Sequence, residues 1–133
     1  MDTILRLLTP KKATYFILDT STIRQALEKF DAHKFSVVPL LNKNGEYVGT
    51  LSEGDILRYI KNEVNFDIEK AENVLVKDIA HYRPYKCLKI DATIEEIYVI
   101  SLDQSFVPLI DDQNHYIGII KRKDVLIHLN EKK

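Results

Sequence analysis

Four residues that could contact a charged ligand occur in this sequence as two pairs with the same spacing. Gly49 and Asp55 recur as Gly118 and Asp124, 69 positions later. In each copy an apolar segment runs into the glycine, and the aspartate follows at the start of an expected helix. A helix N-terminus favours an anion through its free N–H groups and partial positive charge, glycine lets a ligand approach the backbone, and a carboxylate accepts hydrogen bonds from a diol such as ribose. The pattern therefore indicates a candidate ligand-binding site in each copy.

Ser52 adds a hydroxyl group to the first copy, three residues before Asp55. A serine hydroxyl at this place can bond a phosphate group, or it can cap the helix by accepting a backbone hydrogen bond. Both residues suit a helix start, so a purely structural role is an alternative to ligand binding. Repetition in the same frame favours binding, although a duplicated fold would also repeat its caps.

The repeated segments, residues 36–60 and 105–129, are identical at eight of 25 paired positions. Each has the pattern of a strand, a tight turn, a strand, a loop and a helix. Neither half of the chain is long enough to bury much apolar surface alone, whereas two packed halves are. We therefore expect one domain over residues 1–133, with a first repeat at about 8–61 and a second at about 74–129.

Periodicity and capping residues place the remaining elements. In the first half we expect a short helix at 3–8, a buried strand at 14–18, a helix at 23–33, strands at 35–41 and 47–51, and a helix at 53–62. A polar, partly helical connector covers 62–71, and residues 74–79 begin the second repeat. There we expect a strand at 86–90, a helix at 94–102, strands at 106–110 and 116–120, a helix at 122–129 and a solvated end at 130–133. Each repeat is predicted as β-α-β-β-α, with Pro39 in an edge strand or an interrupted ladder.

Composition and motifs argue against several classes of function. The net charge is −1, so no general polyanion-binding surface is implied. The sequence contains no motif of the common enzyme classes, and its histidines (His33, His81, His115 and His128) lie at unrelated places, as surface or helix-end residues do. We therefore expect no enzymatic activity, no metal site and no required cofactor.

The single cysteine, Cys87, excludes an internal disulfide and is typical of a reducing cytoplasm. Apolar runs are shorter than the roughly 18 residues that suggest a membrane span, and the N-terminal segment lacks the apolar core of a secretion signal. We expect a cytoplasmic protein that contacts neither membrane nor nucleic acid. Cys87 itself is expected to be a small buried hydrophobe rather than a nucleophile.

The doubled pattern of strand, proline, strand, turn and Tyr-hydrophobic-Gly-x-x-Ser-x-x-Asp-hydrophobic-Leu resembles the motif of the cystathionine β-synthase (CBS) domain. Two such motifs in one short chain resemble a CBS pair, or Bateman module, and the resemblance covers residues 8–129. It implies an α/β (α+β) fold in which two repeats pack with pseudo-twofold symmetry. It also implies two adenosine-type ligand sites between the repeats, each with an apolar adenine pocket from one repeat and a ribose-binding aspartate from the other.

Carried onto this sequence, the resemblance implies two crosswise sites. Site A takes from the first repeat Thr14, Tyr15, Phe16, Phe35, Ser36, Val37 and Pro39, and from the second Lys121, Arg122 and Asp124. Site B takes from the second repeat Lys86, Cys87, Leu88, Phe106, Val107 and Pro108, and from the first Ser52, Glu53 and Asp55. Site B keeps the whole Gly-x-x-Ser-x-x-Asp loop, whereas site A has Lys121 where the family favours Ser or Thr.

Two further features make the sites unequal. Lys121, Arg122 and Lys123 form a basic cluster beside a helix start, which either suits a ligand with more phosphate charge at site A or is a solvated patch. Tyr15 and Lys86 fall where a small or apolar residue would face the base. Tyr15 could stack on adenine or fill the pocket itself.

Three functions remain in view. The first is a stand-alone regulatory module that binds AMP, ADP or ATP, forms a homodimer through its helices and signals to a partner protein, since the chain has no room for an output domain. Cyclic di-AMP is a competing ligand within this class. The second is a dimerisation or docking module with degenerate ligand sites. The third, a small enzyme, is supported by no nucleophile–base or metal set.

Overall fold

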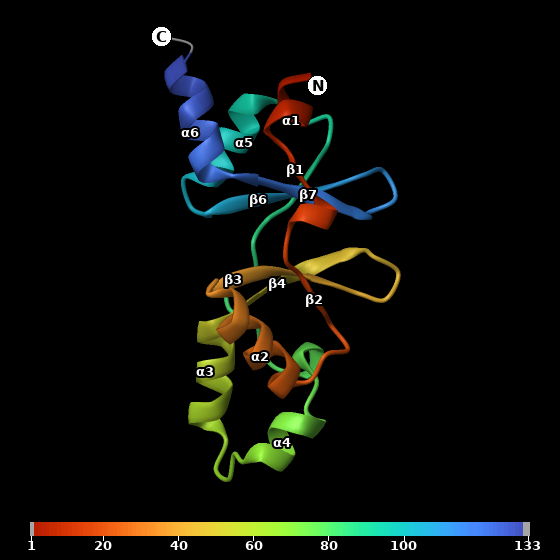
Figure 1. Ribbon diagram of the computed structural model, residues 1–133, viewed down its shortest axis with the longest axis vertical. Helices are drawn as coiled ribbons and strands as arrows, with labels where there is room; N and C mark the ends of the chain where they lie inside the picture. The colour runs from red at the N-terminus through yellow and green to blue at the C-terminus, as the bar shows by residue number, and fades with distance from the viewer. Residues whose placement is uncertain (1, 132–133) are drawn as a thin grey trace. The chain divides into compact units, whose positions relative to one another are not determined.

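Figure 1 shows the computed structural model of the protein, which describes residues 2–131. The chain divides into two compact units, each of which takes more than one segment. Unit 1 consists of Met1–Tyr15, Gly45–Tyr47 and Tyr85–Lys133, and unit 2 of Phe16–Asn44 and Val48–Pro84. Part of the expected solvated end, Lys132 and Lys133, lies outside the described residues.

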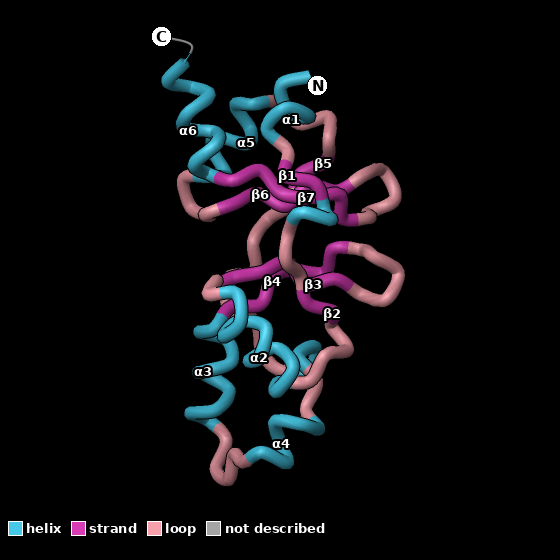
Figure 2. Tube along the Cα trace, viewed as in Figure 1, coloured by secondary structure: helices cyan, strands magenta, loops and turns pink. Residues whose placement is uncertain are grey.

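Unit 2 is built on a three-stranded sheet of order β2-β3-β4, whose strands are magenta in Figure 2. Strand β2 is parallel to β3. Its elements in chain order are β2 (Ile17–Leu18), α2 (Ile23–His33), β3 (Val37–Leu41), β4 (Tyr47–Ser52), α3 (Glu53–Asn62), α4 (Ile68–Asn73) and a 3-10 turn at Val76–Asp78. Alternate strand residues and the apolar helix faces meet in one core, which includes Ile23, Phe30, Leu51, Ile56 and Val76.

Unit 1 is built on a four-stranded sheet of order β1-β7-β6-β5. Its elements are α1 (Asp2–Leu7), β1 (Thr9–Pro10), a 3-10 turn at Lys11–Ala13, β5 (Leu88–Lys89), α5 (Ile94–Ser101), β6 (Phe106–Ile110), β7 (Tyr116–Lys121) and α6 (Arg122–Glu131). Ile4 of α1 joins Ile97, Val107, Ile120 and Val125 in the core of this unit. The N-terminal helix therefore packs with elements from the second repeat.

Reciprocal capping fixes where the helices begin. Thr22 accepts a hydrogen bond from the backbone N–H of Gln25, whose side chain accepts one from the N–H of Thr22, and Thr93 and Glu96 make the same pair. Both capping boxes were predicted from sequence and are confirmed. The bounds of α2, α3 and β6 agree with the prediction, and those of α1, α5, α6, β3, β4 and β7 differ from it by at most two residues.

Prolines shorten the two parallel ladders. The strands predicted at 14–18 and 86–90 are wrong in length, because only Ile17–Leu18 and Leu88–Lys89 are strands. They pair with Leu40–Leu41 and Leu109–Ile110, the two residues that follow Pro39 and Pro108. Proline has no N–H to donate, so each ladder stops beside it. Since β3 lies in the centre of its sheet, the edge-strand alternative is wrong and the interrupted ladder is confirmed.

Two features were not predicted. Thr9–Pro10 pairs antiparallel with Gly118–Ile119, so the chain near the N-terminus adds a strand to the sheet of unit 1. Residues 74–79, which the sequence indicated as the start of the second repeat, pack with unit 2 instead, as do the residues that follow them up to Pro84. The repeat limits inferred from similarity and the compact units are therefore different divisions of the chain.

Candidate functional site

The start of α3 holds Ser52 and Asp55 in a reciprocal pair. Ser52 Oγ accepts a hydrogen bond from the Asp55 N–H at 3.1 Å, and Asp55 Oδ2 accepts one from the Ser52 N–H at 2.9 Å. The next N–H, that of Glu53, donates to the carbonyl oxygen of Ser36 at 3.0 Å. The capping role considered for Ser52 and Asp55 is confirmed, and part of the donor set of this helix is already used.

The other oxygen of Asp55 also has partners. Oδ1 accepts hydrogen bonds from Arg58 Nη2 and from the backbone N–H of Tyr82, each at 2.8 Å. The Arg58 guanidinium lies 4.7 Å from the centre of the Tyr82 ring, and that of Arg83 lies 5.2 Å from it. With 2% of its surface exposed, Asp55 is buried, paired with a cation and hydrogen-bonded at both oxygens.

A cavity of about 350 Å³ lies beside Asp55 within unit 2. Its lining comes from α3 and from the segment after the 3-10 turn: Asp55, Arg58, Tyr59, Asn62, Ala80, His81 and Tyr82. The Nδ1 atom of His81 lies 3.0 Å from the carbonyl oxygen of Thr50, and Nε2 lies 2.8 Å from that of Val76. His81 therefore holds the segment that carries Tyr82, so the expectation of a surface or helix-end residue is wrong for this histidine.

A second cavity, of about 390 Å³, lies beside Asp124 within unit 1. Its lining comes from α6 and from the N-terminal segment: Thr3, Arg6, Leu7, Leu8, Thr9, Asp124, Ile127, His128 and Glu131. Asp124 is partly exposed, in contrast to the buried Asp55. The Nε2 atom of His128 is buried and has no hydrogen-bond partner within the part of the chain that the structure describes.

The expected basic cluster is not a set of three equal cations. Nε of Arg122 donates to the carbonyl oxygens of Ser101 at 2.7 Å and of Gln104 at 3.1 Å, which ties the start of α6 to the end of α5. Lys121 and Lys123 are exposed. Arg122 thus has a structural role that its position in the sequence did not indicate.

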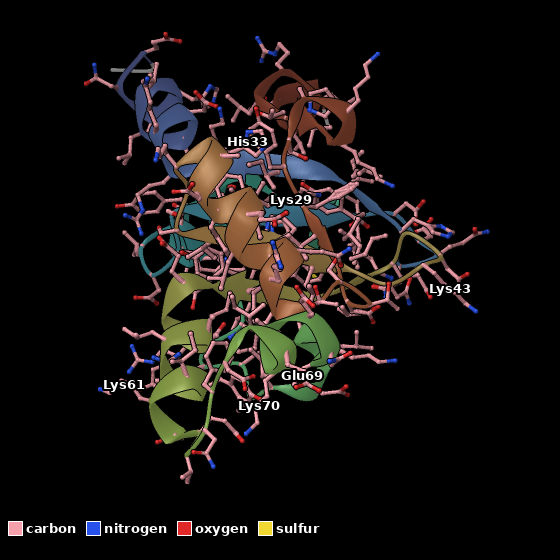
Figure 3. All side chains as sticks on the ribbon, turned by 60° about the horizontal axis from the view of Figure 1, so that its bottom comes forward. Lys29, His33, Lys43, Lys61, Glu69 and Lys70 are labelled. Carbon is pink, nitrogen blue, oxygen red and sulfur yellow. The ribbon has the colours of Figure 1, made fainter. Side chains whose placement is uncertain are left out.

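The first residues assigned to site A lie before β2 rather than in it. The Thr14 hydroxyl donates to the carbonyl oxygen of Lys11 at 2.8 Å. Tyr15 is 54% exposed, and the carbonyl oxygen of Phe16 accepts a hydrogen bond from Lys29 Nζ at 3.0 Å. Lys29, labelled on α2 in Figure 3, also lies 5.9 Å from the centre of the Phe16 ring. Phe16 is therefore fixed against α2, whereas Tyr15 is largely open to solvent.

The next site A residues lie at the start of β3. The Phe35 ring packs edge-on against Phe30 at 5.2 Å and parallel to His33 at 5.8 Å, and it borders the core of unit 2. Val37 and Pro39 alternate with core residues along β3, so they face the other side of the sheet. These two side chains share one face, as a ligand pocket would require.

Gln104 holds the segment that begins site B. Its side chain accepts a hydrogen bond from the Lys86 N–H at 2.7 Å and donates to the carbonyl oxygens of Lys86 at 3.1 Å and Phe106 at 3.0 Å. Burial raises the pKa of the neighbouring Cys87 thiol, which fits a small apolar side chain better than a nucleophile. Leu88 borders the core of unit 1. No sequence pattern pointed to Gln104.

The β6 residues of site B face two ways. Val107 is fully buried in the core of unit 1, and therefore its side chain faces away from Phe106 and Pro108 on the alternating strand. The Phe106 ring lies 4.8 Å from that of Tyr85. Of these three predicted residues, Phe106 and Pro108 share a face and Val107 does not.

Each crosswise site would combine residues of unit 1 with residues of unit 2, and both assignments stay predictions. Within the described residues no group of three His, Cys, Asp or Glu side chains could hold a metal ion. None of the helices in residues 2–131 has the length and apolar character needed to cross a bilayer.

A doubled motif, two β-α-β-β-α halves and aspartates at the starts of α3 and α6 define a class of protein. The chain belongs to the CBS domain family, because the family model described as "CBS domain" matches residues 10–62 and 76–131. Among solved structures it is similar to CbpB in complex with c-di-AMP, with 30% identity, a TM-score of 0.83, and coverage of 95% of this chain and 83% of that one. CbpB from Streptococcus agalactiae is 29% identical, with a TM-score of 0.82 and coverage of 98% and 84%.

Curated relatives include proteins much longer than this chain. A homoserine O-acetyltransferase of Methanocorpusculum labreanum is 27% identical over 104 residues, which cover 78% of this chain and 20% of that protein. The gamma-3 subunit of 5'-AMP-activated protein kinase from Bos taurus is 25% identical over 83% of this chain and 23% of its own length. The chain thus spans about a fifth of the length of these relatives.

Proposed function

We propose that this chain is a regulatory module that binds an adenine nucleotide and passes the bound state to a partner protein. The observation that carries the proposal is the repeated aspartate, Asp55 and Asp124, placed in the first turn of a helix and beside a cavity in each unit. A carboxylate at this place can accept hydrogen bonds from ribose hydroxyls, while helix N–H groups favour phosphate. The proposed sites are the crosswise sites A and B.

Cyclic di-AMP is the second candidate ligand. The similarity to CbpB in complex with c-di-AMP supports it, because that comparison covers 95% of this chain at 30% identity. AMP, ADP, ATP and cyclic di-AMP share the adenosine phosphate that the site would recognise. The nucleotide binds without reacting, and its binding shifts a conformational equilibrium of the protein.

The proposal includes a homodimer formed through helices. Leu57 on α3 and Leu126 on α6 occupy equivalent positions of the repeat, and they are 58% and 50% exposed. Val99 and Leu102, in and just after α5, are also exposed. Apolar helix residues of this kind are a surface that a second copy would cover.

Thermal unfolding with AMP, ADP, ATP, cyclic di-AMP and S-adenosylmethionine tests the proposed function, with GMP and cyclic di-GMP as matched controls. A ligand that binds only the folded state at a hundred times its Kd adds about 2.7 kcal/mol of stability, which raises the midpoint by several degrees. We expect such a rise with at least one adenine nucleotide and none with the guanine compounds. No rise with any of them at about millimolar concentration would reject nucleotide binding and leave the docking module.

A further inference from the structure

Tyr47 and Tyr116 begin the matched strands β4 and β7, occupy equivalent positions of the repeat and are both buried. Their hydroxyl groups bond different kinds of partner. Tyr116 shares a hydrogen bond with the Thr14 side chain, whereas the Tyr47 hydroxyl donates to the main-chain carbonyl oxygen of Tyr85 at 2.5 Å. Tyr85 is followed directly by residues 86–88, which are assigned to site B. Tyr47 therefore bonds the main chain immediately before the first residues of that site.

Tyr47 is itself held in place within unit 1. Its N–H donates to the carbonyl oxygen of Asn114 at 3.2 Å, and the Tyr116 N–H donates to the carbonyl oxygen of Gly45 at 2.9 Å. These bonds keep residues 45–47 beside residues of the second repeat that belong to the same unit. Turn residues of the first repeat thus form part of the unit that contains the assigned adenine half of site B.

The segment that Tyr47 bonds is also attached to the beginning of β6. The Tyr85 ring lies 4.8 Å from that of Phe106. The Gln104 side chain accepts a hydrogen bond from the Lys86 N–H and donates one to the Lys86 carbonyl oxygen. Tyr47 and Gln104 therefore fix two successive residues of the segment through their main-chain atoms.

The hydroxyl group of Tyr47 is more than packing requires. Only 9% of the Tyr47 surface is exposed, and a phenylalanine would fill the same space without burying a polar atom. Burial raises the pKa of the Tyr47 hydroxyl, and the nearby Cys87 thiol and Tyr116 hydroxyl raise it further, so the group keeps its proton and donates in neutral solution. The proton is directed to one main-chain oxygen, which restricts the conformations open to the segment.

From these contacts we infer that Tyr47 is a positioning residue of site B. Its hydroxyl holds the main chain at Tyr85, so that Lys86 and Cys87 have their binding conformation before the ligand binds. The inference rests on the proposed function and deepens it, because a turn residue of the first repeat orders the adenine half that the second repeat supplies. A segment that is ordered in advance loses less conformational entropy on binding, and this raises the affinity.

Chemical modification of Cys87, the single cysteine, measures the order of this segment without a ligand. We expect Tyr47→Phe to raise the rate of modification by N-ethylmaleimide about threefold or more, because the segment opens more often when one of its bonds is lost. Tyr116→Phe is the matched control, since it removes the equivalent hydroxyl, which bonds Thr14 instead, and its rate should stay within about twofold of the unaltered protein. Equal rates in the two variants would overturn the inference.

Protection of Cys87 by AMP, ATP or cyclic di-AMP tests the consequence for binding. We expect nucleotide to slow the modification, and Tyr47→Phe to need about threefold to tenfold more nucleotide for the same protection, which is the effect of one hydrogen bond on a preformed site. Tyr116→Phe should change this requirement by less than about twofold. A merely structural role of Tyr47 would lower the melting temperature in both variants and leave the nucleotide requirement unchanged, and that result would overturn the inference.

Isothermal titration calorimetry with the same nucleotides separates the inference from the proposed function. Binding without protection of Cys87 would place the ligand away from this segment, which would overturn the inference and leave the proposed function intact. Failure of the unaltered protein to bind any of the three nucleotides would reject the proposed function and, with it, the role of Tyr47 in binding. The rates of modification would then still decide whether the Tyr47 hydroxyl orders the segment.

Discussion

The hydroxyl oxygens of Thr14 and Tyr116 lie 2.9 Å apart and share a hydrogen bond. Thr14 follows the 3-10 turn near the N-terminus, and Tyr116 is the first residue of β7. Together with the β1–β7 pairing, this bond ties the N-terminal segment into unit 1. The Tyr116 side chain is almost fully buried, so little water can replace the bond if it is removed.

Tyr116→Phe should destabilise the protein by about 1 kcal/mol, because it removes one partly buried hydrogen bond while keeping the ring. Urea unfolding measures this change. Tyr98→Phe on α5 is the matched control, and since Tyr98 is exposed its effect should stay within about 0.5 kcal/mol. Equal stability of the two variants would contradict a role for the Thr14–Tyr116 bond.

Stability should fall in alkaline solution through the buried tyrosines. Burial raises the pKa of Tyr116 to about 12 against the opposing effect of the Thr14 hydrogen bond, and burial also raises the pKa of Tyr47. Tyrosine in the unfolded chain ionises near pH 10, so from there to about pH 12 unfolding releases protons that the folded chain keeps. Each tyrosine then lowers the free energy of unfolding by about 1.4 kcal/mol per pH unit. Urea unfolding from pH 9 to 11.5 should show this fall in stability with pH, and the fall should be smaller in Tyr116→Phe by the contribution of one tyrosine.

Gly118→Ala should be more damaging than the same change at the matched position, Gly49. A Cβ atom at Gly118 would lie 2.2 Å from the carbonyl oxygen of Thr9, whereas one at Gly49 would lie 3.6 Å from the Pro84 side chain. Both glycines have positive φ, +150° and +142°, so each alanine adds strain of about 1–3 kcal/mol. Only Gly118→Ala adds a clash with the backbone, and this clash would push β1 away from β7. Calorimetry should show the larger fall in melting temperature for Gly118→Ala, and the reverse order would refute the close approach of Thr9.

Gln104→Ala should cost about 2–4 kcal/mol. The change leaves the N–H of Lys86 and the carbonyl oxygens of Lys86 and Phe106 without their partner. The bond to Phe106 is buried and those to Lys86 are partly buried, and an unpaired buried group costs about 1–3 kcal/mol. Gln113→Ala, in an exposed turn, is the control and should be nearly neutral. Hydrogen exchange at the Lys86 amide, faster only in Gln104→Ala, would locate the effect.

Leu126→Asp should weaken the proposed homodimer at least tenfold, because it places a charge in an apolar contact. Light scattering coupled to gel filtration measures the molar mass of the protein in solution and so distinguishes dimer from monomer. Val64→Asp is the control, since Val64 is 91% exposed and lies in the connector between α3 and α4. A monomeric unaltered protein, or equal dissociation of both variants, would rule out an interface at α6.

The sequence predicted the elements well where local signals agree. Thr22 and Thr93 stand at helix starts with Gln or Glu three residues later, and the apolar spacing after them matches the helix period. The connector at 62–71 was correctly expected to be partly helical, and α4 begins there at Ile68. Strand length was less predictable, because Pro39 and Pro108 shorten the strands that pair with β3 and β6 and not β3 and β6 themselves.

The environment of the aspartates could be predicted only in part. Arg58 lies three residues after Asp55 on one helix face, a spacing from which an ion pair can be inferred. The Tyr82 N–H that Asp55 accepts from comes from a segment distant in sequence, and no local pattern indicates it. The packing of residues 2–15 with unit 1 could not be predicted from a local pattern, since similarity between repeats does not say which core a segment joins.

The pairing of Thr9–Pro10 with Gly118–Ile119 has a consequence for synthesis of the chain. Every segment of unit 2 has been translated once the ribosome reaches Pro84, whereas the sheet of unit 1 cannot be completed until β7 has been translated. Because domains can fold as they emerge, unit 2 should form first, while the early residues of β1 stay unpaired until β7 is made. Closing so long a loop is slow, so assembly of the β1–β7 ladder should limit the overall rate of folding.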